Sequence, residues 1–218
     1  MRYASEHKRK TRERILQVAA RAIRLHGVGR VSLNDIMSGA KLTNGGFYGY
    51  FKSKDDLIAE AIKHTFDERH GGFLRRVGTS NPRQALAAFI DHYLSIAHCA
   101  APEFGCPIPV LAADVPHMTR SAKARFSAGM SQLLDGLATL LEDTGVVDAQ
   151  DQARSILSEL VGALALARTC SEPVCARRAL LASRRALKQR YGLPQNGIAR
   201  RPFGHFVDPY SPRGTGRP

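Results

Sequence analysis

The sequence has no apolar run long enough to cross a membrane. Its longest uninterrupted stretch of small and apolar residues covers residues 160–167, whereas a membrane-spanning helix needs about 20 residues. The N-terminus is charged instead of apolar, which argues against a secretory signal. Glu6 and Glu13 interrupt its basic residues, which argues against a transit peptide. We therefore expect a soluble, cytoplasmic protein that has no membrane partner.

Cysteine is scarce, and the motifs of enzymes and metal sites are missing. The chain has 4 cysteines, Cys99, Cys106, Cys170 and Cys175, with no Cys-x-x-Cys pair and no Cys/His cluster at zinc-finger spacing. Without a secretory signal these thiols are expected to be reduced. No nucleophile–base spacing, metal motif or phosphate loop is present. We therefore expect neither catalysis nor a metal or cofactor.

Acidic residues are few, since 19 Asp and Glu stand against 32 Lys and Arg, for a net charge of +13. The charge is unevenly spread, with +7 over residues 1–64, −3 over residues 65–167 and +9 over residues 168–218. A basic head beside a slightly acidic middle favours a polyanion such as DNA as the partner of the head. A solvated charged surface explains the charge alone about as well. Non-specific DNA compaction also stays open.

Strand-like alternation is absent, and apolar residues recur at helical spacing, so the fold class predicted is all-α. The first helix carries Arg12, Arg14, Arg21 and Arg24 mostly outside its apolar stripe, so we expect a basic exposed side. Gly27 is expected to end it. The pattern predicts helices over residues 10–26, 33–40, 44–50, 54–69, 83–99, 116–142, 148–168 and 173–191, with a short segment at 106–113.

Residues 33–40 and 44–50 have the spacing of a helix-turn-helix, whose second helix enters a DNA major groove. Ser32, Thr43 and Ser53 are expected N-caps. The second helix contains three glycines, each of which costs about 0.5–1 kcal/mol of helix stability, so propensity alone would not predict it. Phe47 and Phe51 are expected to anchor it in the core.

The segment from Thr43 to Leu57 reads TNGGFYGYFKSKDDL and resembles the signature of the TetR/AcrR family of transcriptional regulators. The two preceding helices match at the expected spacing, so the resemblance covers residues 10 to about 60. Asn44 departs from the family, where Lys or Arg is common, and Gly49 replaces a frequent His. Because of these departures, the operator sequence cannot be transferred from relatives.

The resemblance implies a three-helix DNA-binding domain with its N-terminal arm at residues 1–53. A larger helical ligand-binding and dimerisation domain follows at 54–191, with 54–70 as the linking helix. The expected contacts to double-stranded DNA are Ser32, Lys41, Thr43, Asn44, Gly45, Gly46, Tyr48, Tyr50 and Lys52. The arm, with Lys8, Arg9, Lys10 and Arg12, either follows a neighbouring phosphate strand or is a solvated end. Residues 192–218, rich in Gly, Pro and Arg, are expected to be a disordered tail.

The family's architecture also implies a homodimer that represses from a palindromic operator and is released by a small apolar ligand. The wall of the ligand pocket is expected to include Phe89, Tyr93, Phe104, Cys106, Val110, Phe126 and Met130. The dimer interface is expected to include Leu157, Val161, Leu164, Leu180 and Leu187.

An alternative is a thiol-switched repressor. Cys106 lies at a transition from loop to helix, where amide dipoles would lower its pKa, and Cys99 would be its resolving partner. The effector, the operator and the regulated genes cannot be read from the sequence.

Overall fold

The computed structural model describes residues 2–75, 77 and 81–195, with side chains from Ser5 onward. These residues form helices and no strands, which confirms the all-α prediction. The predicted tail lies outside the described residues from residue 196 onward. The elements are α1 (Arg2–His26), α2 (Leu33–Gly39), the 3₁₀ helix η1 (Asn44–Gly49), α3 (Lys54–Leu74), α4 (Pro82–Tyr93), α5 (Ile96–Ala100), η2 (Pro102–Phe104), α6 (Ile108–Leu111), η3 (Val115–His117), α7 (Arg120–Asp143), α8 (Ala149–Thr169) and α9 (Pro173–Arg190).

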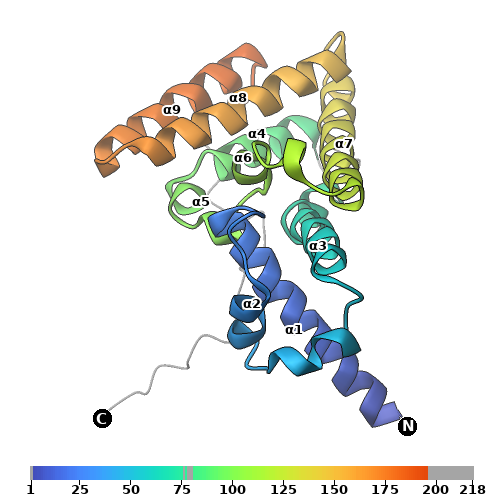
Figure 1. Cartoon of the computed structure of the whole chain (residues 1–218). Coiled ribbons are helices and arrows are strands. Elements are labelled where there is room, and N and C mark those ends of the chain that lie inside the picture. The colour runs from blue at the N-terminus through green and yellow to red at the C-terminus, as the bar shows by residue number, and fades with distance from the viewer. Residues whose placement is uncertain (1, 76, 78–80, 196–218) are drawn as a thin grey trace, which may run out of the picture.

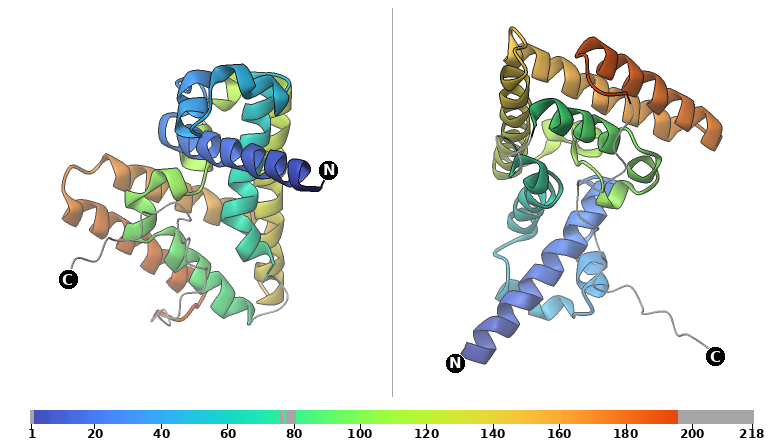
Figure 2. Two further views of the ribbon diagram at one scale, coloured as in Figure 1. Left: turned by 90° about the horizontal axis from the view of Figure 1, so that it is seen from below. Right: turned by 180° about the vertical axis from the view of Figure 1, so that it is seen from behind.

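The molecule has a head made of α1, α2 and η1 and a body made of α3 to α9 (Figure 1). In the body, α3 packs along α7, and α8 packs against both α7 and α9. Helices α8 and α9 lie side by side at the end of the body opposite the head, as Figure 2 also shows from behind. The last turns of α1 reach into the body, where they pack against η2 and α6. None of the described helices is long and apolar enough to cross a bilayer.

Two helices are longer than the sequence predicts. Helix α1 begins at Arg2, so the predicted arm consists of its first turns. Arg12 there lies over the ring of Phe51, with its guanidinium 4.7 Å from the ring centroid. Helix α3 continues through two glycines to Leu74, because its last turn is held by packing: Phe73 is buried, with its ring 4.3 Å from that of Phe89.

Capping side chains divide one predicted helix in two and set a later start for another. The helix predicted over residues 83–99 divides at Leu94, and Ser95 starts α5 by accepting a hydrogen bond from the His98 amide at 3.1 Å. The helix predicted from residue 116 begins only at Arg120, where the Thr119 side chain caps it. In both cases a side-chain oxygen satisfies a backbone N–H that a continuous helix would bond to its own carbonyl.

Gly129 allows α3 and α7 to approach closely. A Cβ atom at this glycine would overlap the ring of Phe66, which is buried and lies edge-on to Phe126 at 5.6 Å. We expect Gly129→Ala to lower the free energy of unfolding by about 1–3 kcal/mol, because the inserted methyl group has to displace the ring. Urea unfolding measures this change.

Gly162 supplies the matched control for this prediction. It also lies within a long helix, α8, but nothing lies within 4 Å of the position of its Cβ. Gly162→Ala should therefore raise the free energy of unfolding by about 0.5–1 kcal/mol, through helix propensity alone. Equal effects of the two substitutions would contradict close packing between α3 and α7.

Candidate nucleic-acid interface and interior polar cluster

The turn of the predicted helix-turn-helix is closed by backbone hydrogen bonds. The Lys41 amide donates to the Ser38 carbonyl, and the Leu42 amide donates to the Met37 carbonyl, both at 2.9 Å. This pair of bonds is the Schellman arrangement, which needs a left-handed residue after the helix. Lys41 takes that conformation, with φ 56°, where glycine is usual. The turn thereby presents the Lys41 side chain to solvent.

The N-termini of α2 and α3 are capped as the sequence predicts. Ser32 Oγ accepts from the Asp35 amide at 3.1 Å and donates to the Asp35 carboxylate at 2.5 Å. At α3, Ser53 Oγ accepts from the Asp56 amide, and the Asp56 carboxylate accepts from the Lys52 amide, both at 3.0 Å. The second bond, to the residue before the N-cap, fixes the backbone at Lys52 while its side chain stays exposed.

The second helix of the motif, η1, is a 3₁₀ helix. Thr43 precedes it in an extended conformation, as an N-cap residue does, but its side chain forms no capping hydrogen bond. Phe47 and Phe51 are buried, and their rings stack with centroids 5.9 Å apart. This confirms both residues as core anchors. Packing of the two rings therefore holds a segment that its glycine content would leave unstable.

The nine residues predicted to contact DNA gather at the start of α2, in the turn, on η1 and before α3. Eight are exposed, with Tyr48 at 75%. Tyr50 is the exception, because it is half-buried against the core. The Asn44 side-chain amide donates to the Asn34 side-chain oxygen at 3.2 Å, which links η1 to α2. Sequence reasoning missed Asn34, since a single exposed asparagine carries no signal of its own.

The glycines of η1 leave its backbone open. Nothing lies within 4 Å of the Cβ position at Gly45, Gly46 or Gly49. None of the three has a positive φ. Neither internal packing nor backbone conformation therefore requires glycine at these positions. Their effect is that the backbone of η1 can be approached closely from outside.

Comparison with known proteins agrees with this geometry. Residues 15–61 match the family model of bacterial regulatory proteins of the tetR family. The HTH-type transcriptional regulator AcrR of Shigella flexneri is 39% identical over 59 residues, which are 27% of each chain. A TetR-family regulator from Agrobacterium tumefaciens has the same fold, with a TM-score of 0.73 and 22% identity over 84% of this chain and 98% of the other. The chain carries the DNA-binding region of the tetR family of bacterial regulatory proteins.

The family comprises regulators, not enzymes. The match to AcrR spans about a quarter of that relative and lies in the DNA-binding part. The reduced form of Escherichia coli NemR shares the fold, with a TM-score of 0.68 and 19% identity over 79% of this chain and 95% of the other. For the body of the chain, likeness to solved structures therefore extends to the fold alone.

The last turns of α1 connect the head to the body. The Arg21 guanidinium lies over the ring of Phe104, 4.9 Å from its centroid. Gly27 ends the helix with φ 79°, as predicted, and the next amide, that of Val28, donates to the Asp114 carboxylate at 2.7 Å. A Cβ atom at Gly27 would meet the same carboxylate. The turn after α1 therefore docks directly onto the body.

A polar cluster lies where α1 enters the body. Arg24, which the helical pattern places on an exposed side, is only 1% exposed, and it donates to the Glu68 carboxylate at 2.7 Å. Arg69 contacts the His92 ring. Arg168 donates to the backbone carbonyls of His98 and Cys99, at 3.1 and 3.3 Å.

Several buried donors in this cluster have no hydrogen-bond partner among the described residues. They are Nε and Nη1 of Arg24, Nη1 of Arg168 and the hydroxyl of Tyr93. Buried polar groups are nearly always paired, because an unpaired group loses its hydration without compensation. Four such atoms therefore set this region apart from an ordinary satisfied core.

The histidines of the cluster are uncharged at neutral pH. Burial, together with the positive charge of Arg69, lowers the pKa of His98 to about 2. Burial likewise lowers the pKa of His70 to about 3 and that of His92 to about 4. Neutral His98 donates from Nδ1 to the Tyr93 carbonyl at 2.7 Å, while its Nε2 accepts from the Cys106 amide at 2.9 Å. The positive charge of the cluster therefore comes from its guanidinium groups.

The cysteines differ from the sequence prediction. Cys106 is fully buried, and burial raises the pKa of its thiol, so the lowered pKa predicted from nearby amide dipoles is wrong. Its amide is already bonded to His98. Cys170 and Cys175 form a disulfide across the turn from α8 to α9, with Cα atoms 5.8 Å apart, so they are not the reduced thiols expected. Cys99 and Cys106 are free.

The predicted pocket residues divide between two regions. Tyr93 and Cys106 belong to the polar cluster, and Phe104 borders it beneath Arg21. Phe126 packs on Phe66 in the apolar core. The other three are also core or near-core residues, with Phe89 buried and Val110 and Met130 half-buried.

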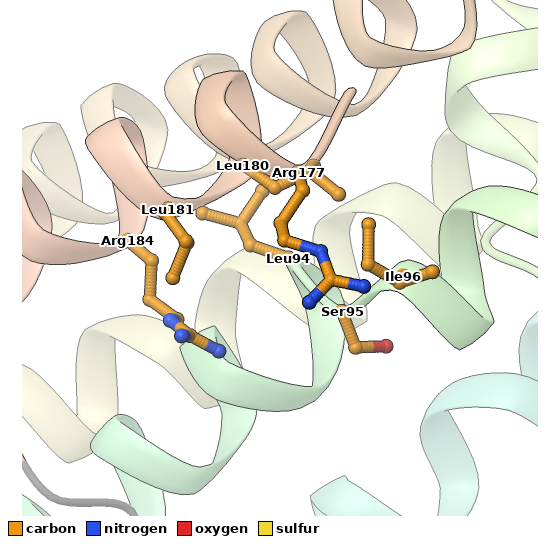
Figure 3. A pocket seen from close by; sticks show the side chains of 7 residues that line it. All are labelled: Leu94, Ser95, Ile96, Arg177, Leu180, Leu181 and Arg184. Atoms are coloured by element: carbon orange, nitrogen blue, oxygen red, sulfur yellow. The ribbon is translucent and has the colours of Figure 1, made fainter. Parts of the chain in front are cut away.

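A groove lies elsewhere, between α9 and the junction of α4 and α5 (Figure 3), and none of the predicted pocket residues lines it. Its volume of about 280 Å³ is just below the usual range for ligand pockets. The lining residues are Leu94, Ser95, Ile96, Arg177, Leu180, Leu181 and Arg184.

The residues predicted for the dimer interface require a correction. Leu157, Leu164, Leu180 and Leu187 are buried within the single chain, and Val161 is half-buried. The four leucines fill the space between the last two helices and the rest of the body, so they are not available to a second copy. The exposed apolar side chains near the turn from α8 to α9 are Leu166 and Val174, at 67% and 66%.

Proposed function

We propose that this TetR/AcrR-family chain is a transcriptional repressor that binds a palindromic operator as a homodimer and is released by a small-molecule effector. The observation that carries the proposal is η1, an exposed segment whose glycine backbone faces open space while two buried phenylalanines hold it. Such a segment allows close approach to a major groove. Tyr48 on η1 and Lys52 after it are both exposed, and their donor groups suit contacts to phosphates.

We also propose that the two parts of the chain have separate roles. Residues 1–53 act as the DNA-binding domain, and residues 54–191 bind the effector and a second copy. The surface for the second copy includes Leu166 and Val174. Because its target is chromosomal DNA, the protein acts in the cytoplasm.

A reversible ligand is favoured over a thiol switch at Cys106. Reactive cysteines are accessible thiolates, whereas Cys106 is buried and its pKa is raised. The thiol switch predicts that Cys106→Ser abolishes induction and leaves operator binding intact. A reversible ligand predicts that the Cys106→Ser variant still responds.

The first test selects bound fragments from the source genome and compares the affinity for the best fragment with that for scrambled DNA at two salt concentrations. We expect a palindromic site that is preferred by at least about 10³-fold. Affinity should fall steeply with salt, because phosphate contacts release counterions. Sedimentation of the complex then gives the number of chains bound per site. Equal affinity for both DNAs would contradict the proposal and favour non-specific compaction.

A further inference from the structure

The polar cluster at the junction of α1 with the body carries more positive charge than its ion pairs neutralise. Arg24, Arg69 and Arg168 all contribute guanidinium groups, which keep their charge at any physiological pH. Among the described residues, Glu68 is the carboxylate that forms an ion pair with this group, through Arg24. Glu103 acts on Arg168 at longer range. The histidines in the cluster are neutral and add no charge.

The residues with unpartnered donors lie around His98 and Cys106. The Tyr93 ring is 4.9 Å from the His98 ring, Arg168 donates to the His98 carbonyl at 3.1 Å, and the Cys106 amide donates to His98 Nε2 at 2.9 Å. Arg24, Arg168 and Tyr93 each lie close enough to the Cys106 thiol to interact with it electrostatically. Arg24 and Tyr93 are each 1% exposed, and each has a donor without a partner. These side chains come from α1, α4 and α8, so three separate helices contribute buried donors to the same region.

The chemistry of these donors selects the ligand. Guanidinium forks and a phenol O–H match the oxygens of a carboxylate. A carboxylate carries one charge, so it costs less to remove from water than a phosphate dianion. The aromatic surroundings suit an organic body, since the Tyr93 ring lies 5.8 Å from that of Phe89 and 4.9 Å from that of His98.

We propose that the effector is a small organic carboxylate whose carboxyl oxygens accept hydrogen bonds from Arg24, Arg168 and Tyr93. The proposal rests on the proposed function and replaces the wholly apolar ligand predicted from the sequence. Arg24 couples this site to the DNA-binding head, because it lies on α1 between two docking contacts. Arg21, which packs on Phe104, is less than one turn before it, and the Gly27 turn is less than one turn after it. A ligand that binds Arg24 better in one position of α1 shifts the equilibrium between head positions.

The test uses the full chain without DNA and two matched probe pairs, benzoate with benzamide and octanoate with octanamide. Binding of inorganic phosphate is measured in a separate experiment at equal ionic strength. Calorimetry gives the dissociation constants, and thermal unfolding gives the shift in midpoint. We expect at least one carboxylate to bind at least about tenfold more tightly than its neutral amide, as a hydrogen bond to a charged group predicts.

Tyr93→Phe is the informative variant, because the buried hydroxyl that it removes has no hydrogen bond of regular geometry and faces only the Cys106 thiol, a weak acceptor. The unfolding midpoint of the free variant should be unchanged or higher, while carboxylate binding weakens about tenfold. Arg168→Gln should weaken binding similarly. Arg120→Gln, which changes an exposed arginine at the start of α7, should have no effect on binding.

Three results would overturn the proposal. The carboxylates could bind no better than their amides, or phosphate could bind as tightly as the carboxylates. The third is a Tyr93→Phe variant that loses stability and keeps its affinity for the carboxylate. Operator binding is measured separately. Loss of operator preference together with intact carboxylate binding would reject only the repressor function. Operator preference without carboxylate binding would reject only this inference.

Discussion

Asp91→Ala is expected to lower the free energy of unfolding by roughly 3–5 kcal/mol. The Lys188 ammonium on α9 donates to both carboxylate oxygens of Asp91 on α4, at 2.8 and 2.9 Å, and the Lys188 side chain is only 2% exposed. Its remaining contact is a weaker bond to the Gln195 carbonyl at 3.2 Å. Removing the carboxylate therefore leaves a buried charge without a counterion, which costs more than the ion pair itself contributes.

Urea unfolding of the Asp91→Ala variant checks this value, and two further variants make it specific. Asp135→Ala removes an exposed carboxylate from α7 and should change the free energy of unfolding by less than about 0.5 kcal/mol. The double change Asp91→Ala with Lys188→Met removes both charges and should recover most of the stability, since an apolar side chain needs no counterion. If the double variant is no more stable than Asp91→Ala, the loss comes from packing and not from the unpaired charge.

The head could be predicted in detail because its determinants are local. Ser32 and Ser53 cap helices whose first turns follow within three residues, and Phe47 and Phe51 anchor η1 from within the same short segment. Short-range patterns contain this information. The same reasoning gave no basis for a 3₁₀ helix in place of an α-helix, because tertiary packing of two rings decides the geometry of a glycine-rich segment.

The interior cluster could not be predicted, because its members are distant in sequence. Arg24 and Arg168 lie on α1 and α8, and each looks like a solvated residue of an amphipathic helix. Burial of Arg24 depends on where the end of α1 meets the body, which no window along the chain contains. The four leucines of the predicted dimer interface were wrong for a related reason: a leucine stripe marks a buried face but does not say whether the same chain or a second copy covers it.

Adding methyl groups to η1 is expected to separate DNA binding from folding. Gly45→Ala with Gly46→Ala should leave the free energy of unfolding unchanged or raise it by about 0.5–1 kcal/mol per site, because neither position is crowded or has a positive φ. The same double variant should bind the operator roughly ten- to a hundredfold more weakly, since each lost base or backbone contact is worth about 1–3 kcal/mol.

The measurement pairs urea unfolding with fluorescence anisotropy on the selected operator and on scrambled DNA. Gly162→Ala is the matched control, because it makes the same chemical change at an open position on α8, far from the head. It should keep full operator affinity. If the η1 variant keeps its operator affinity as well, the open glycine backbone is not a DNA surface. A variant that loses affinity and stability together would mean that the glycines serve the fold. Loss of operator affinity in a fully stable chain is the outcome that a close approach of η1 to DNA requires, because only a partner from outside can meet methyl groups that point into open space.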